Sequence, residues 1–150
     1  MIFISFVIDA ILSILIDNFI PLTIVSTIAF LSYYKNDDAI LRKILIVGIL
    51  YDVVYTNTII LNSLAFYMLY IVSLLFNQKF KKNLFNLLIL NILLLIVYFS
   101  ITYLILTLYQ VINISIVSIL KDILNCALFN TFYLSIIYFI IVKKMHKIKW

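Results

Sequence analysis

A carboxylate inside an apolar segment is the group in this sequence best suited to chemistry. Asp52 lies in the run GILYDVV, four residues after the chain's one glycine, Gly48, and Asn62 follows ten residues later. Burying an ionised carboxylate in hydrocarbon costs at least ~2.5 kcal/mol, so such residues usually face a partner, a cavity or water. We therefore expect Asp52 to accept hydrogen bonds from a neighbouring helix, a ligand or a proton pathway, or to serve only helix packing.

The spacing of Gly48 and Asp52 places both residues on one face of a helix, because residues four apart are neighbours on a helix surface. A glycine on that face allows the backbone of another helix to approach closely. Asn62 is expected near the outer end of the hairpin that this helix forms with the next one. Gly48, Asp52 and Asn62 are therefore candidate structural or interaction residues.

Asp9, near the middle of the first apolar segment, is a further candidate. It is expected to pair with a polar group across the bundle. If that group is Asp52, the two carboxylates would share a proton; otherwise Asp9 reaches an interface or bonds to a serine or asparagine. The last two long apolar segments also carry polar residues that are expected to form hydrogen bonds between helices and to serve packing: Asn86, Asn91, Ser100, Thr102, Asn125, Asn130, Thr131 and Ser135.

The elements that must position these residues are membrane helices. The chain has 150 residues, of which 67% are hydrophobic and 11% charged, which is too little polar surface for a soluble domain. In lipid, only helices and closed barrels satisfy every backbone group, and long apolar runs without alternation favour helices. The chain has one glycine and one proline, so it contains no stretch with the composition of a flexible linker between two domains. We predict a single all-α domain over residues 1–150.

The hydropathy pattern predicts a bundle of six spans. Pro21 lies at the start of the second, where a missing N–H costs little. Residues 111–120 are too short to span and are expected to form an interfacial or re-entrant piece. The six predicted spans are residues 1–16, 19–34, 44–55 (with a start as early as 39), 59–76, 84–109 and 123–142.

The distribution of basic residues predicts the orientation of the bundle. With six spans, ten of the eleven Lys and Arg residues fall on the side of the two termini, and Lys121 alone falls on the other. Cytoplasmic loops carry the excess of Lys and Arg, so both termini are predicted to be cytoplasmic. The net charge of +5 is explained by this topology, and nucleic acid is not an expected partner.

The sequence contains no arrangement typical of catalysis. It has no glutamate, no glycine-rich phosphate loop, no metal-ligand spacing and no Ser–His pair. Cys126 is the one cysteine, so there is no disulfide framework and no cysteine metal cluster. We therefore expect a protein that is not an enzyme and that uses no cofactor or metal.

The residues around Asp52 resemble a motif of the MreD family of rod-shape-determining membrane proteins. In that family the pattern runs approximately G-L-L-x-D-L, then a short outward turn, then G-x-N-A-L. Gly48, Asp52, Asn62 and Leu64 stand at the matching positions. Pro21 ahead of the second helix and a basic loop ahead of the third are also similar to the family's layout.

The sequence departs from the family pattern at several positions. Ile60 stands where a glycine is expected, Ser63 where an alanine is expected, and residues 54–56 where small residues are expected. The motif-level resemblance covers about residues 21–70, and beyond them only hydropathy agrees.

The resemblance implies a non-enzymatic scaffold of the cell-elongation machinery in the bacterial cytoplasmic membrane. Its implied partners are membrane lipids, the bitopic protein MreC, the cytoskeletal protein MreB and, through them, the peptidoglycan synthases. Two alternatives remain open. One is a substrate-capture subunit of a vitamin or small-solute transporter, which has similar size and topology, and the other is a small immunity or regulatory membrane protein.

Overall fold

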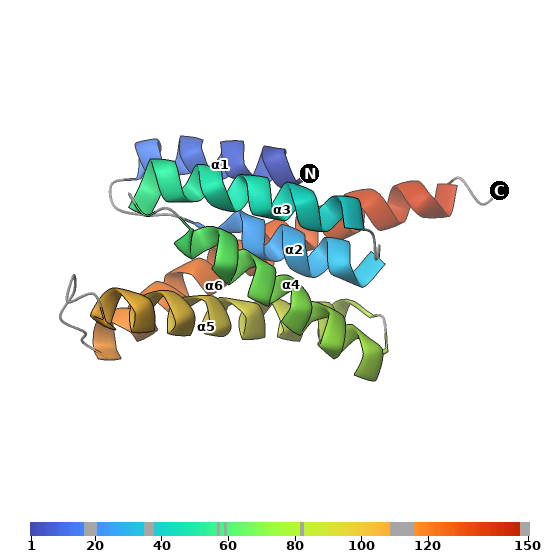
Figure 1. Ribbon diagram of the computed structural model, residues 1–150. Coiled ribbons are helices and arrows are strands. Elements are labelled where there is room, and N and C mark those ends of the chain that lie inside the picture. The colour runs from blue at the N-terminus through green and yellow to red at the C-terminus, as the bar shows by residue number, and fades with distance from the viewer. Residues whose placement is uncertain are drawn as a thin grey trace.

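The protein is a bundle of helices, as the sequence predicts (Figure 1). The computed structural model describes residues 1–16, 21–34, 38–56, 58, 60–81, 83–108 and 116–147, with the backbone alone at 116, 118 and 142–147. Within these ranges the chain forms six α-helices and one π-helical turn. They are α1 (Ile2–Leu15), α2 (Thr23–Tyr34), α3 (Asp38–Tyr51), the π-helical η1 (Asp52–Thr56), α4 (Leu61–Lys79), α5 (Leu84–Leu108) and α6 (Ile116–Lys147).

Three helices are long and apolar enough to cross a membrane: α4, α5 and the Ile119–Ile141 part of α6. The helices α1 and α2 are apolar but have only 14 and 12 residues. At 1.5 Å per residue, they reach about 21 and 18 Å, less than the ~30 Å of a bilayer's hydrocarbon core. A multi-pass membrane protein is the architecture that these lengths support.

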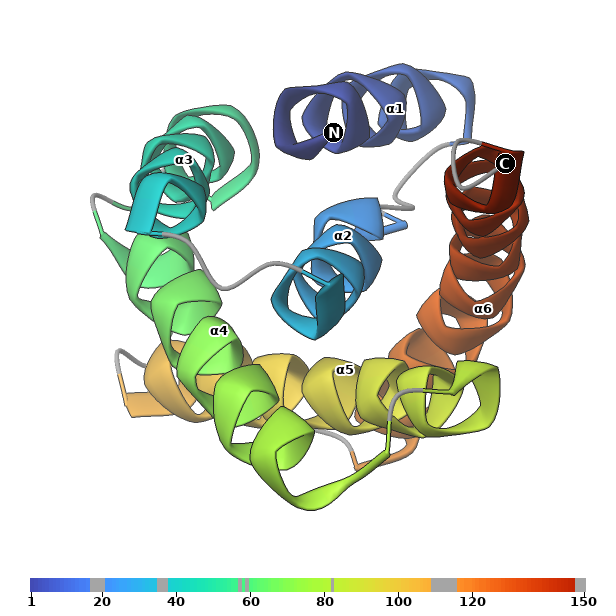
Figure 2. The ribbon, with the colours of Figure 1, turned by 90° about the vertical axis from the view of Figure 1, so that its right-hand side faces the viewer.

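The shortest of the six α-helices, α2, lies in the middle of the bundle (Figure 2). It contacts α1, α4, α5 and α6, and ten of its twelve residues are buried. Several of them are small and polar, so neighbouring helices can approach closely and hydrogen-bond to it. Because α2 is surrounded by protein, its length does not have to match the thickness of the bilayer.

The last helix differs from the prediction. It begins at Ile116, so residues 116–120 belong to α6 and not to a separate interfacial piece, while residues 111–115 lie outside the described part of the chain. Lys121 and Asp122, interpreted as the boundary before a helix at 123, lie inside α6. The Tyr103 hydroxyl of α5 donates a hydrogen bond to Asp122 Oδ2 at 2.5 Å, so this carboxylate has a partner without interrupting the helix.

Two other boundaries also differ. The second helix begins at Thr23 and not at 19, and the third begins at Asp38, the earlier of the two predicted starts. The start of α1 and the end of α6 lie toward the same end of the bundle, and the last turns of α6 extend past the neighbouring helices (Figure 1).

Candidate functional site

Asp52 is fully buried and caps the N-terminus of α4. Its Oδ1 accepts hydrogen bonds from the Asn62 backbone N–H at 2.8 Å and from Asn62 Nδ2 at 3.0 Å, and its Oδ2 accepts the Ser63 N–H at 3.4 Å. The first N–H groups of a helix have no acceptor within the helix, and a negative charge there also interacts favourably with the helix dipole. We call these contacts the Asp52 cap.

Two threonines and a tyrosine extend the Asp52 cap. Thr58 Oγ1 donates to Asp52 Oδ1 at 2.8 Å, and Thr56 Oγ1 lies 3.3 Å from the same oxygen. On the far side, the Tyr98 hydroxyl of α5 donates to Asn62 Oδ1 at 2.7 Å. The Asn62 side chain therefore bonds both to Asp52 and to Tyr98 of α5. One hydrogen-bond network thus joins the end of α3, the start of α4, and α5.

Gly48 lies one helical turn before Asp52 and allows α4 to approach α3. A Cβ at this position would lie 2.8 Å from both the backbone N and the Oγ of Ser63, and still closer to the Ser63 Cα. Real Cβ atoms do not tolerate such distances, so any side chain would push the two helices apart. Gly48, Asp52 and Asn62, the three candidate residues of the predicted hairpin, meet at this one junction.

Asp9 is also fully buried, and it caps the N-terminus of α2. Its Oδ1 accepts the Thr23 N–H at 2.9 Å, and its Oδ2 accepts the Ile24 N–H at 3.4 Å. The Tyr51 hydroxyl of α3 donates to the same Oδ2. We call these contacts the Asp9 cap. The structure thus places the partners of Asp9 on α2 and α3, and each of the two carboxylates has its own donors.

The two caps share one design. Each carboxylate is carried by one helix of a hairpin and holds two consecutive N–H groups at the start of the next helix. Unsatisfied backbone groups cost several kcal/mol in lipid, so a helix start buried in the bundle needs such an acceptor. The α1–α2 and α3–α4 hairpins therefore repeat one arrangement, which the sequence does not reveal because the intervals from carboxylate to capped helix differ.

The neighbouring residues Tyr51 and Asp52 connect the two caps. Consecutive residues on a helix point about 100° apart, so Tyr51 faces α1 while Asp52 faces α4. The Phe66 ring packs against both tyrosines of the network, with ring centroids 5.1 Å from Tyr51 and 5.7 Å from Tyr98. The π-helical turn η1 begins at Asp52, and such turns often occur at functional sites.

Pro21 lies just ahead of α2, which begins at Thr23 and not at 19, and the Pro21 carbonyl oxygen accepts a hydrogen bond from Asn130 Nδ2 of α6. The next residue, Leu22, has a φ of 55°. This left-handed conformation costs a residue with a side chain about 1–2 kcal/mol. Two hydrogen bonds hold the backbone on either side of Leu22: Asn130 Nδ2 donates to the Pro21 carbonyl, and the Thr23 N–H donates to Asp9.

A third polar cluster joins α2, α5 and α6 at the centre of the bundle. Ser26 Oγ lies 3.0 Å from Asn91 Oδ1 and 2.5 Å from Asn130 Oδ1, and all three residues are fully buried. Asn91 and Asn130 were expected to bond between helices, but Ser26 was not. Four of the other residues expected to do so bond instead to carbonyl oxygens of their own helix: Ser100, Thr102, Thr131 and Ser135. A serine in an apolar segment is a weak signal, and nothing in the sequence pairs residue 26 with residue 130.

These groups hold helices together, and their geometry suits that role. The oxygens of both carboxylates face donors from the protein itself. In the described part of the chain, no three His, Cys, Asp or Glu side chains lie close enough to hold a metal ion. What the site can do is fix where α2 and α4 begin relative to α1, α3 and α5.

In comparisons with known proteins, no family model, no curated protein and no solved structure matches this chain. Its function must therefore be inferred from its own residues and their arrangement.

Proposed function

We propose that this protein is a non-enzymatic scaffold of the bacterial cell-elongation machinery that acts as MreD proteins do. The single observation that carries the proposal is the junction of α3 and α4. The residues Gly48, Asp52 and Asn62, on which the resemblance to MreD depends, come together there in one hydrogen-bonded contact between two helices. A motif that builds a fixed hairpin is what a scaffold requires.

The hydrogen bonds that Asp52 accepts from the protein itself support a scaffold role for this junction over a ligand-binding role. Asp52 Oδ1 already accepts hydrogen bonds from Asn62 and Thr58, and the Asn62 side chain is held by Tyr98. A ligand at this position would have to displace protein donors. The bonding capacity of Asp52 is thus used to fix the shape of the bundle, and the outer helix faces are left for partners.

Of the three long helices, α6 has the smallest share of its apolar span buried inside the protein. Only 17% of its apolar span is buried, against 44% for α4. Residues Leu120, Leu124, Leu128 and Phe132 lie on one stripe at intervals of four and are exposed. Such a stripe faces lipid or the membrane helix of a partner, and a bitopic protein such as MreC has a helix of this kind.

The proposed orientation places both termini and ten of the eleven basic residues in the cytoplasm. In this orientation the Asp52 cap lies toward the outer side of the membrane, where the extracytoplasmic part of MreC would lie. The proposed partners MreB and the peptidoglycan synthases would be reached through MreC.

The experiment is co-purification with MreC encoded by the same genome. Both proteins are co-expressed, MreC carries the affinity tag, and the ratio of the two chains is measured after size exclusion in mild detergent. We expect a fixed ratio for the wild type and for Asp52→Asn, and loss of the complex for Asp52→Leu. The control Asp38→Asn changes an exposed carboxylate at the start of α3 and should leave the ratio unchanged.

Two results would overturn the proposal. One is a monodisperse, folded wild-type chain that does not elute with MreC. The other is a small molecule bound at a stoichiometric ratio to the purified chain and lost in Asp52→Leu, which would identify a substrate-capture subunit instead.

A further inference from the structure

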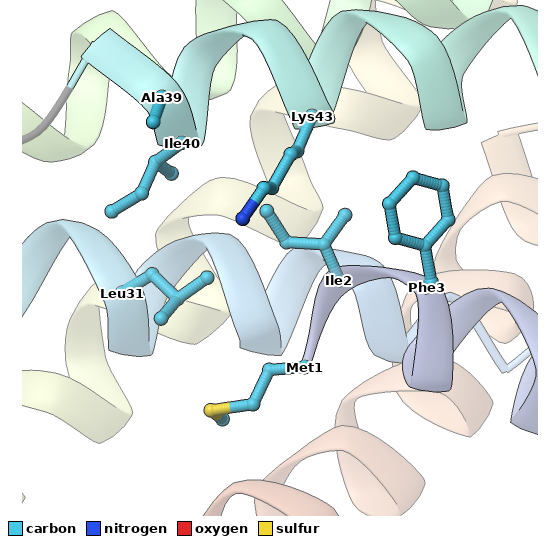
Figure 3. Close-up of a pocket in the computed structure, with 7 residues that line it drawn as sticks. All are labelled: Met1, Ile2, Phe3, Leu31, Ala39, Ile40 and Lys43. Atoms are coloured by element: carbon cyan, nitrogen blue, oxygen red, sulfur yellow. The ribbon is translucent and has the colours of Figure 1, made fainter.

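A cavity of about 300 Å³ opens at the end of the bundle where α1 and α3 begin and α2 ends (Figure 3). Residues 1–3 form one wall, Leu31 of α2 forms the second, and Ala39, Ile40 and Lys43 of α3 form the third. This cavity lies away from the two carboxylate caps, because Asp9 lies in the middle of α1 and Asp52 follows the last residue of α3. None of the hydrogen bonds described above uses its lining side chains.

The lining is apolar except for one cation. Figure 3 shows the Lys43 side chain leaving α3 and directing its amine toward Ile2 and Leu31, into the space between the three helices. Among the described residues that form the walls there is no acidic side chain. A positive charge beside apolar walls attracts an anion more strongly than the same charge in bulk water, because the local dielectric is lower.

The position of the cavity favours a lipid over a soluble anion. It lies at helix ends, where lipid headgroups are found, and the Tyr33 hydroxyl bonded to the Lys81 carbonyl shows that the α4–α5 connection lies at the same end. Arg42 and Lys79 also lie at this end and outnumber the exposed carboxylate of Asp38. Basic pockets between membrane helices bind anionic headgroups, whereas a free anion would gain nothing from apolar walls.

The size of the cavity also fits part of a lipid. A volume of about 300 Å³ is at the lower limit for ligand pockets, enough for the headgroup and glycerol region while the acyl chains stay in the bilayer. On the outer side, Phe3, Val7 and Ile11 of α1 are exposed in a row along which an acyl chain can lie.

The geometry points to a binding site for an anionic phospholipid between α1, α2 and α3, with the lipid phosphate on Lys43. The site would attach this end of α1, which buries few residues, to the rest of the bundle. The inference is independent of the proposed scaffold function, because it concerns a different part of the molecule.

The test is a lipid titration of the purified chain in detergent, followed by native mass spectrometry. Phosphatidylglycerol and phosphatidylcholine with identical acyl chains are compared, and inorganic phosphate is added as a competitor. We expect tighter binding of phosphatidylglycerol, a loss of about fivefold in its affinity for Lys43→Gln, and a smaller loss for phosphatidylcholine, whose choline cation offsets the charge of its phosphate. Ala39→Leu, which narrows the cavity, should weaken phosphatidylglycerol binding while Lys43 is retained.

Arg42→Gln is the matched control, because Arg42 and Lys43 are both exposed but only Lys43 lines the cavity. Equal losses for Arg42→Gln and Lys43→Gln would overturn the proposal in favour of diffuse surface charge. Equal affinity for the two lipids, or full competition by millimolar phosphate, would also overturn it. Melting temperatures without added lipid establish that each variant is folded.

Discussion

At the scale of single residues, Gly48 decides how closely α3 and α4 pack. Alanine is favoured over glycine inside a helix by about 1 kcal/mol, so the substitution Gly48→Ala would stabilise an isolated helix. Here the new Cβ would meet backbone atoms of Ser63, which cannot move without shifting α4. Overpacking of this kind costs about 1–3 kcal/mol, and we expect it to outweigh the gain in helix propensity.

The measurement is the free energy of unfolding of Gly48→Ala in mixed micelles, titrated with a denaturing detergent. We expect a net loss of about 1 kcal/mol and a larger loss for Gly48→Val. Ile49→Ala is the control on the same helix, because Ile49 is 51% exposed and should change stability little. An alanine variant as stable as the wild type would contradict the close approach.

The substitutions Asp52→Asn and Asp52→Leu separate hydrogen bonding from charge. Asparagine keeps an oxygen that can accept the Asn62 N–H, so the expected loss is about 1 kcal/mol. Leucine leaves the Asn62 and Ser63 donors buried without an acceptor, at about 1–3 kcal/mol each. The unfolding titration checks this order, with Asp38→Asn as the exposed control. Equal losses for the two Asp52 variants would show that the cap does not form.

The sequence was informative about these residues for a physical reason. A carboxylate is so costly in hydrocarbon that Asp9 and Asp52 were expected to face a partner, a cavity or water, or, for Asp9, the membrane interface. What the sequence could not predict is which donors they face. The Asp9 cap depends on residues 23, 24 and 51, and only the folded chain brings these together.

At the scale of elements, the central position of α2 is the feature that hydropathy could not predict. All six segments are apolar, and hydropathy alone does not distinguish a helix surrounded by protein from one facing lipid. A signal was present in Thr23, Ser26, Thr27 and Ser32, which are all buried in α2. Ser5 Oγ of α1 lies 2.5 Å from Thr27 Oγ1, and Asn77 Nδ2 of α4 donates to Ser32 Oγ at 3.3 Å. Small polar residues here mark contact with neighbouring helices.

The attachment of α6 to α2 gives a prediction at this scale. Asn130 is the buried polar contact of α6 with Ser26 and with the Pro21 carbonyl. Hydrogen bonds between membrane helices contribute about 0.6 kcal/mol on average and up to about 1.7 kcal/mol. We expect Asn130→Leu to lower the free energy of unfolding by about 1–2 kcal/mol, because it removes several such bonds.

The matched control is Asn125→Leu, which makes the same change at an exposed position on the same helix. It should leave stability unchanged or raise it slightly, since leucine is favoured in lipid. If the two asparagine variants lose the same stability, the central cluster contributes nothing specific to packing.

At the scale of the whole molecule, short and long helices share one bilayer. The helix α1 exposes Ile4, Val7, Ile11 and Ile14 on its outer face, yet it has only 14 residues. A helix shorter than the hydrocarbon core is accommodated by local thinning of the bilayer, whereas α5, with 25 residues, needs tilt. The bundle is thus thin on the α1 side, and lipid bound at the open end of α1 would lie deeper in the membrane than lipid beside α5.

The orientation of the bundle can be tested with cysteines at its two ends. Cys126 is buried, and Cys126→Ser gives a background without the native thiol. Ile60→Cys places a thiol at the exposed start of α4, and Lys81→Cys places one in the α4–α5 connection, so α4 separates the two positions. In intact cells a membrane-impermeant maleimide should label Ile60→Cys, and it should label Lys81→Cys only after permeabilisation, because the Lys-rich side is predicted to be cytoplasmic. The reverse labelling pattern would show that the bundle has the opposite orientation. The Asp52 cap would then face the cytoplasm, where it could not lie beside the extracytoplasmic part of a bitopic partner.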